Sequence, residues 1–60
     1  METWDKLTQD EKDWIKEHGY GEKDVNECPP EYTINMLWGE YAYRGYVLGD
    51  AEEMARRLRK

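Results

Sequence analysis

The sequence predicts a small all-α domain, and three observations support this prediction. A capping pattern at Thr8 and a glycine at residue 19 mark the two ends of one helix. Apolar residues between 34 and 48 recur at helical spacing. The segment from Asp50 onward places acids early and bases late, as the helix dipole favours. We therefore expect a single three-helix domain over residues 1–60.

The first helix is expected at residues 8–18. Thr8 and Glu11 have the spacing of a capping box, in which each side chain satisfies a free backbone amide at the start of a helix. Gly19 can adopt the left-handed conformation that ends a helix, and Tyr20 would then fold back onto the last turn in a Schellman arrangement.

Residues 21–30 are expected to be a polar loop. They include a glycine, an asparagine and two prolines, which favour irregular structure. Either Pro29 or Pro30 suits the first position of the next helix, because its missing amide would be unpaired there. The loop carries three acids, Glu22, Asp24 and Glu27.

Two structures compete for residues 32–48. A helix is indicated by apolar residues at steps of three and one, namely Ile34, Leu37, Trp38, Tyr41, Ala42, Gly45 and Leu48. The alternative is an α+β domain with a hairpin at residues 32–47, because Gly39-Glu40 suits a two-residue turn and tyrosine favours strands. We favour the helix, since its stripe is longer than any clean alternation. Its expected core residues are Ile34, Leu37, Trp38, Tyr41 and Leu48.

The last helix is expected to begin after Asp50, which is a good cap. Its first turn is acidic and its end is basic, and both placements favour the helix dipole. Its buried stripe is expected to be Ala51, Met54, Ala55 and Leu58.

Composition excludes several classes of function. The chain has a formal net charge of −5, which repels phosphate backbones and disfavours direct nucleic-acid binding. A single cysteine rules out an internal disulfide, and the sequence has no apolar run long enough to span a membrane. We expect a cytoplasmic protein, in the host cytosol if a phage encodes it. With 38% apolar residues the core is thin, so a homodimer or a bound target would help stability.

No catalytic set is visible, so we expect no enzyme, cofactor or metal. The sequence contains no serine, and Cys28 lies beside two prolines, far in the chain from the lone His18. We interpret Cys28 as a partly buried apolar group and His18 as a last-turn histidine that the helix dipole favours.

Two surfaces are candidates for partner binding. Asp10, Asp13 and Glu17 lie within about 60° on the first helix, next to the loop acids Glu22 and Asp24. They could be a solvated surface, or they could occupy a basic groove in place of nucleic-acid phosphates. The second surface is aromatic, because so many tyrosines cannot all enter a small core. Its candidates are Tyr32, Tyr43, Arg44 and Tyr46.

The C-terminal part resembles ArdA-type antirestriction proteins over about 18 residues. The resemblance rests on Tyr41-Ala42-Tyr43-Arg44-Gly45, followed by Asp50, Glu52, Glu53, Ala55 and Leu58. Those proteins are much longer acidic DNA mimics carried by mobile elements, so the resemblance implies inhibition of a host DNA-binding enzyme. In this chain the acidic surface would come from residues 10–31, since the last helix ends in basic residues.

Our leading hypothesis is a small acidic inhibitor of the kind that phages and mobile elements encode, which binds a host defence or nucleic-acid-processing protein. One alternative is a structural or assembly protein that self-associates through its aromatic surface. Another is an oligomer that sequesters a nucleotide between its tyrosines and Arg44.

Overall fold

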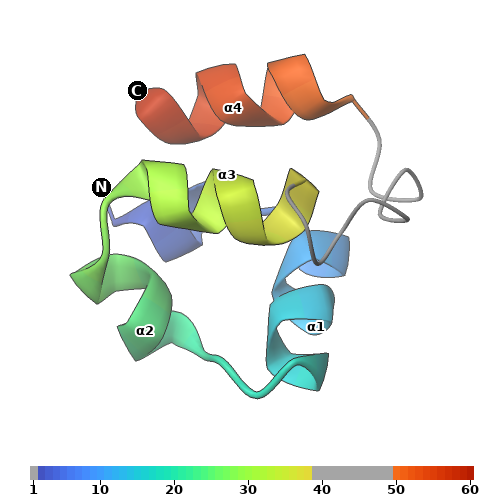
Figure 1. Cartoon of the computed structure of the whole chain (residues 1–60), viewed down its shortest axis with the longest axis vertical. Helices are drawn as coiled ribbons and strands as arrows, with labels where there is room; N and C mark the ends of the chain where they lie inside the picture. Colours follow the sequence, from blue (N-terminus) through green and yellow to red (C-terminus); the bar gives the residue numbers. More distant parts are fainter. Residues whose placement is uncertain (1, 39–49) are drawn as a thin grey trace.

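The structure is a computed structural model that describes residues 2–38 and 50–60 (Figure 1). A short 3-10 helix, η1 (Thr3–Lys6), precedes the first α-helix. The α-helices are α1 (Gln9–Glu17), α2 (Glu22–Glu27), α3 (Pro30–Trp38) and α4 (Ala51–Arg59). The described residues contain no strand, so the all-α prediction is confirmed.

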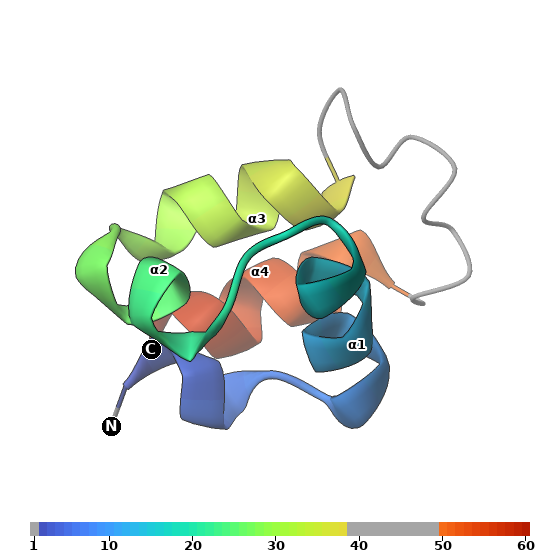
Figure 2. The ribbon, with the colours of Figure 1, turned by 90° about the horizontal axis from the view of Figure 1, so that it is seen from below.

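Helix α3 lies at the centre of the arrangement. It packs against α4 on one side and against α1 and α2 on the other, while η1 contacts α2 and α4. Figure 1 shows α4 above α3, with α1 and α2 below them, and Figure 2 shows the same helices from below. The outer surface of α1 and the outer surface of α4 therefore belong to different sides of the molecule.

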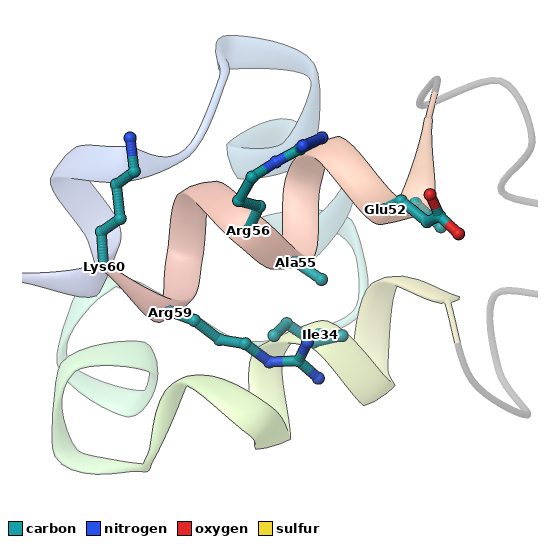
Figure 3. Close-up of a pocket in the computed structure, with 7 residues that line it drawn as sticks. Ile34, Glu52, Ala55, Arg56, Arg59 and Lys60 are labelled. Carbon is teal, nitrogen blue, oxygen red and sulfur yellow. The ribbon is translucent and has the colours of Figure 1, made fainter.

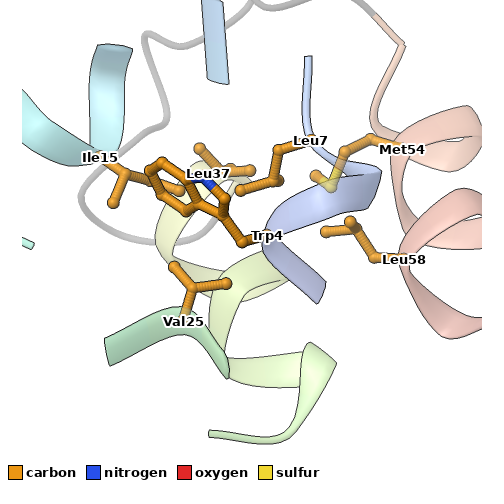
Figure 4. Packing of buried hydrophobic residues seen from close by; sticks show 7 residues of the cluster. All are labelled: Trp4, Leu7, Ile15, Val25, Leu37, Met54 and Leu58. Atoms are coloured by element: carbon orange, nitrogen blue, oxygen red, sulfur yellow. The ribbon is translucent and has the colours of Figure 1, made fainter. Parts of the chain in front are cut away.

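The core draws side chains from every described element (Figure 4). Ile15, Val25, Leu37 and Leu58 are completely buried, although they come from four different helices. Trp4 and Leu7 add the N-terminal segment, and Met54 adds a second residue from α4. No single helix supplies this core, so the elements depend on one another for burial.

The first predicted helix is confirmed at both ends. The Thr8 side chain accepts a hydrogen bond from the Glu11 amide at 3.2 Å, and the Glu11 carboxylate accepts one from the Thr8 amide at 2.8 Å. Gly19 has a φ of 87°, in the left-handed region. The amide of Tyr20 donates to the Ile15 carbonyl at 3.1 Å, which is the long bond of a Schellman motif.

The prediction of a loop over residues 21–30 was wrong for residues 22–27, which form α2. The carboxylate of Asp24 accepts a hydrogen bond from the Gly21 amide at 3.0 Å and so caps the helix start. Val25 is fully buried and fastens the helix to the core. One buried residue in a short helix leaves no periodic signal, and η1 was missed for the same reason.

The hairpin alternative is wrong where the structure describes it, because residues 32–38 belong to α3. The remainder of that segment, 39–47, lies outside the described residues. Of the expected core residues, Leu37 is buried and Ile34 and Trp38 are half-buried against the core. Two others, Tyr41 and Leu48, lie outside the described residues.

The last helix follows the prediction. The Asp50 carboxylate accepts hydrogen bonds from the amides of Glu52 and Glu53, at 2.8 and 3.3 Å. The expected stripe faces α3 and η1, with Ala51 half-buried and the other three residues buried, namely Met54, Ala55 and Leu58. Within residues 2–38 and 50–60, every helix is too short and too polar to cross a membrane.

Candidate protein-binding site

The predicted acidic residues of α1 and α2 are all exposed. We define the acidic face as five carboxylates, Asp10, Asp13, Glu17, Glu22 and Asp24. On α1 the direction follows from helix geometry, because each residue turns the side chain by about 100°. Asp13 and Glu17 therefore point nearly opposite to Ile15, which is fully buried. These two carboxylates therefore point away from the core and into solvent.

The lysines of α1 do not lie among these carboxylates. The Nζ atoms of Lys12 and Lys16 lie 5.6 and 5.9 Å from the centre of the Trp4 ring. Such a position over an aromatic face is attractive for a cation. Both lysines thus occupy the flank of α1 next to η1, and the acidic face keeps its negative charge.

The acidic face takes no part in the salt bridges between described residues. Those bridges join Arg57 to Glu11 and Glu53, and Arg59 to Glu31. The carboxylates of the face instead make local contacts or none: Asp13 accepts a hydrogen bond from the Gln9 amide group at 2.9 Å, and Asp24 caps α2.

The carboxylates of the acidic face differ in where they lie along their helices, and therefore in how the helix dipole affects them. Asp10, Glu22 and Asp24 lie in first turns, where the helix dipole favours negative charge, so each has a structural explanation. Glu17 is the last residue of α1, where the dipole disfavours a carboxylate. Glu17 therefore has no local stabilising role within the described structure, and is the member of the face that most needs a functional explanation.

An aromatic edge borders the acidic face. Helix geometry predicts that Trp14 and His18 share one side of α1, but the sequence analysis did not name them as a candidate binding surface. The rings of Trp14 and His18 stack with centroids 3.7 Å apart and an angle of 17° between their planes. One ring nitrogen of His18, Nδ1, lies 2.8 Å from the Trp14 carbonyl oxygen. Tyr20 follows directly and is exposed. The 100° rule places Trp14 and His18 at one flank of the acidic face, with the two lysines at the other. An i, i+4 aromatic pair is the sequence signal that would have found it.

Only one of the four residues of the predicted aromatic surface lies among the described residues. Tyr32 on α3 is 63% exposed, which agrees with its predicted surface position. The other three candidates, Tyr43, Arg44 and Tyr46, lie outside the described residues. Of the predicted site, the structure therefore shows that the five carboxylates and Tyr32 are exposed.

Among the described residues, no group of three His, Cys, Asp or Glu side chains is arranged to hold a metal ion. Cys28 is half-buried at the end of α2, as its interpretation as a partly buried residue predicted.

A second surface feature, also missed by the sequence analysis, is a groove of about 700 Å³ between α3 and α4 (Figure 3). Ile34, Ala51 and Ala55 give it an apolar lining, and one acid, Glu52, and three cations also line it. These cations are Arg56, Arg59 and Lys60. The groove depends on how α4 packs on α3, so no local pattern predicts it.

Comparison of the chain with protein-family models, with curated proteins and with solved structures gives no match. The class that fold and surface define is a small helical protein with a polarised charge distribution, acidic on α1 and α2 and basic at the end of α4.

Proposed function

We propose that this protein is an inhibitor that binds a basic surface of another protein through its acidic face. The observation that carries the proposal is the set of five exposed carboxylates that no cation of the described residues pairs with. Unpaired charges of one sign steer association with a surface of the opposite sign and set its orientation. The adjacent Trp14–His18 stack offers apolar area for short-range contact.

The target class we propose is a nucleic-acid-binding protein of a host cell, such as a defence or nucleic-acid-processing enzyme. Such proteins present basic grooves to phosphates, and carboxylates on a rigid helix can occupy the same grooves. The resemblance of residues 41–58 to antirestriction proteins supports the same target class and an origin in a phage or mobile element.

The test begins with affinity capture from host lysate on the immobilised chain, followed by kinetics with the purified partner. Asp13→Lys/Glu17→Lys should slow association at least about tenfold and flatten its dependence on salt, with a smaller effect on dissociation. Glu2→Lys/Asp5→Lys is the matched control, because it changes the net charge equally at two exposed positions on η1 and its cap.

A partner that binds the control and the parent chain alike, loses association with the acidic-face variant, and releases duplex DNA when the chain is added would support inhibition by charge mimicry. Equal association of all three proteins across a salt series would show that the acidic face is only a solvated surface.

A further inference from the structure

The groove between α3 and α4 is lined by three cations and one acid, Glu52. Arg59 is engaged, since its Nη2 donates to Glu31 at 3.0 Å. Arg56 and Lys60 are exposed and take part in no salt bridge among residues 2–38 and 50–60. They lie one helical turn apart on α4, and both belong to the residues that line the groove (Figure 3).

The same spacing with the opposite sign occurs on α1. Asp13 and Glu17 are also separated by four residues, on a helix of the same length as α4. Both pairs are exposed, and their helices, α1 and α4, lie on opposite sides of α3 (Figure 1). One copy can therefore present its carboxylate pair to the cation pair of another copy while its own groove stays open.

The surroundings of the two pairs fit as well. The groove has an apolar lining from Ile34, Ala51 and Ala55, and the small alanines leave room for a neighbouring side chain. The half-buried Trp14 stands beside the carboxylate pair on α1 and brings apolar surface to the contact. The net charge of −5 repels a nucleic-acid strand and a second copy alike, but a second copy also carries nine cations of its own, whereas the strand presents only phosphates.

We propose that the α3–α4 groove binds the acidic face of α1 from a second copy of this chain, head to tail. Asp13 and Glu17 of one copy pair with Arg56 and Lys60 of the next. Such a contact joins two different surfaces, so each added copy leaves one free groove and one free acidic face, and assembly continues to a ring or a short filament. Since the proposed target uses the same carboxylates, self-assembly and target binding exclude one another. That last consequence rests on the proposed function, whereas the head-to-tail contact does not.

Variants that each lose one side of the contact test it with the chain alone. Arg56→Gln/Lys60→Gln keeps the acidic face and loses the groove cations, and Asp13→Asn/Glu17→Gln does the reverse. In sedimentation experiments at low salt, the parent chain should form species larger than a dimer. Each variant alone should associate at least about tenfold more weakly, the loss expected for a broken charge pair. An equimolar mixture should form one-to-one complexes and nothing larger.

A charge exchange provides the second test and keeps the net charge at its original value. The fourfold variant Asp13→Lys/Glu17→Lys/Arg56→Glu/Lys60→Glu should recover assembly, whereas either reversed pair alone should abolish it. Lys6→Gln removes a cation away from both the groove and the acidic face and should assemble like the parent chain. Circular dichroism verifies that each variant is folded. If a neutral variant does not fold, the charge-reversed variant of the same two residues replaces it in the experiment, and the reverse also holds.

Three results would overturn the proposal. The parent chain could remain monomeric at millimolar concentration, or the two neutral variants could fail to pair when mixed. Alternatively, assembly could respond equally to the Lys6→Gln control, which would make it a general effect of charge. Binding of a short duplex DNA that depends on Arg56 and Lys60, without self-assembly, would assign the groove to nucleic acid instead. Because no partner is needed, these failures are separate from a failure of the proposed inhibition.

Discussion

At the scale of single residues, Arg57 connects three elements. Its Nη1 donates to the Lys6 carbonyl at 2.6 Å and to the Glu11 carboxylate at 2.9 Å, and its Nη2 donates to the other Glu11 oxygen at 3.1 Å. Nε and Nη2 also each donate to a Glu53 carboxylate oxygen, both at 3.1 Å. The hydrogen bonds to Glu11, and then those to Glu53, raise the pKa of the guanidinium, which therefore stays charged. Glu11 thus caps α1 and holds α4 with the same carboxylate.

Loss of Arg57 should be among the most damaging single changes on the surface of α4. Arg57→Met keeps most of the aliphatic stem but leaves Glu11, only 1% exposed, as an uncompensated buried charge. We expect the free energy of unfolding to fall by about 3 kcal/mol, as for other broken buried ion pairs. Arg56→Met, at an exposed neighbour, should change it by no more than about 0.5 kcal/mol. Urea unfolding followed by tryptophan fluorescence measures both, and equal stability of the two variants would contradict this role.

Two glycines close together in the chain differ in the conformations they require. Gly19 has a φ of 87° and Gly21 a φ of −145°, and an added Cβ would meet no atom within 4 Å at either position. Gly19→Ala should therefore cost about 1 kcal/mol through backbone conformation alone. Gly21→Ala should stay within about 0.5 kcal/mol of the parent, because extended backbone suits alanine. The comparison uses thermal unfolding, and an equal loss at both sites would mean that the left-handed turn is not what ends α1.

At the scale of elements, the C-terminal part of α4 forms one salt bridge with α3 and another within α4 itself. The Arg59 guanidinium hydrogen-bonds to Glu31 and lowers the pKa of that carboxyl, and Arg57 does the same to Glu53. In both cases the folded chain has a pKa below the ordinary value of 4.5. The unfolded chain then binds more protons as the pH falls below that value, and unfolding is favoured.

With respect to these two groups, stability should be nearly constant at about one pH unit or more above 4.5, and should decline progressively as the pH falls from there through their lowered pKa values. Glu31→Gln removes one contribution and should make the decline shallower. Glu27→Gln, at an exposed glutamate without a salt bridge among the described residues, should leave the slope as it is. Urea midpoints across the acidic range give the slopes, and the same slope for the parent and Glu31→Gln would refute the contribution of the Glu31–Arg59 pair.

Elements that carry their own start and stop signals were predictable from sequence. The boundaries of α1 and α4 follow from side chains that bond to backbone within a few residues, as Thr8 and Asp50 do. The 3-10 helix η1 has no side-chain cap, and α2 has a local cap from Asp24 but is also held by a distant partner. The Trp4 amide donates to the Asn26 side chain at 2.9 Å, across 22 positions of the chain. Neither segment has a local pattern that indicates this contact.

The features of the candidate site also divide into those that follow from local sequence and those that depend on tertiary packing. Helical geometry was enough to place Asp10, Asp13 and Glu17 on one exposed face, because these residues share one helix. The pairing of Glu11 with Arg57, 46 positions apart, and the groove between α3 and α4 both depend on tertiary packing. Glu11 was predicted only as a capping residue, and its burial could not be inferred from the capping pattern.

At the scale of the whole molecule, α4 completes both the core and its electrostatics. Met54 and Leu58 are 1% and 0% exposed, and they bury the remaining side of a cluster that begins at Trp4. Arg57 neutralises Glu11 from the same helix. The residues before α4 therefore keep an open apolar surface and a buried carboxylate without a partner when α4 is absent.

A chain of residues 1–49 should for that reason lack a cooperative unfolding transition, even though α1 and α3 remain in its sequence. The lost burial of Met54 and Leu58 costs about 1.5–3 kcal/mol for each side chain, and the unpaired Glu11 adds to it, in a domain whose total stability is only about 3–5 kcal/mol. Short helices are marginal by themselves, so the helical circular dichroism should fall well below that of the full chain.

Glu11→Gln within residues 1–49 is the informative second variant, because it removes the buried charge but not the exposed apolar surface. If this variant restores cooperative unfolding, the main contribution of α4 to stability is the charge of Arg57. If it does not, the main contribution is the packing of the apolar side chains of α4. A sharp thermal transition in the unmodified 1–49 chain would show that the first three α-helices fold independently of α4.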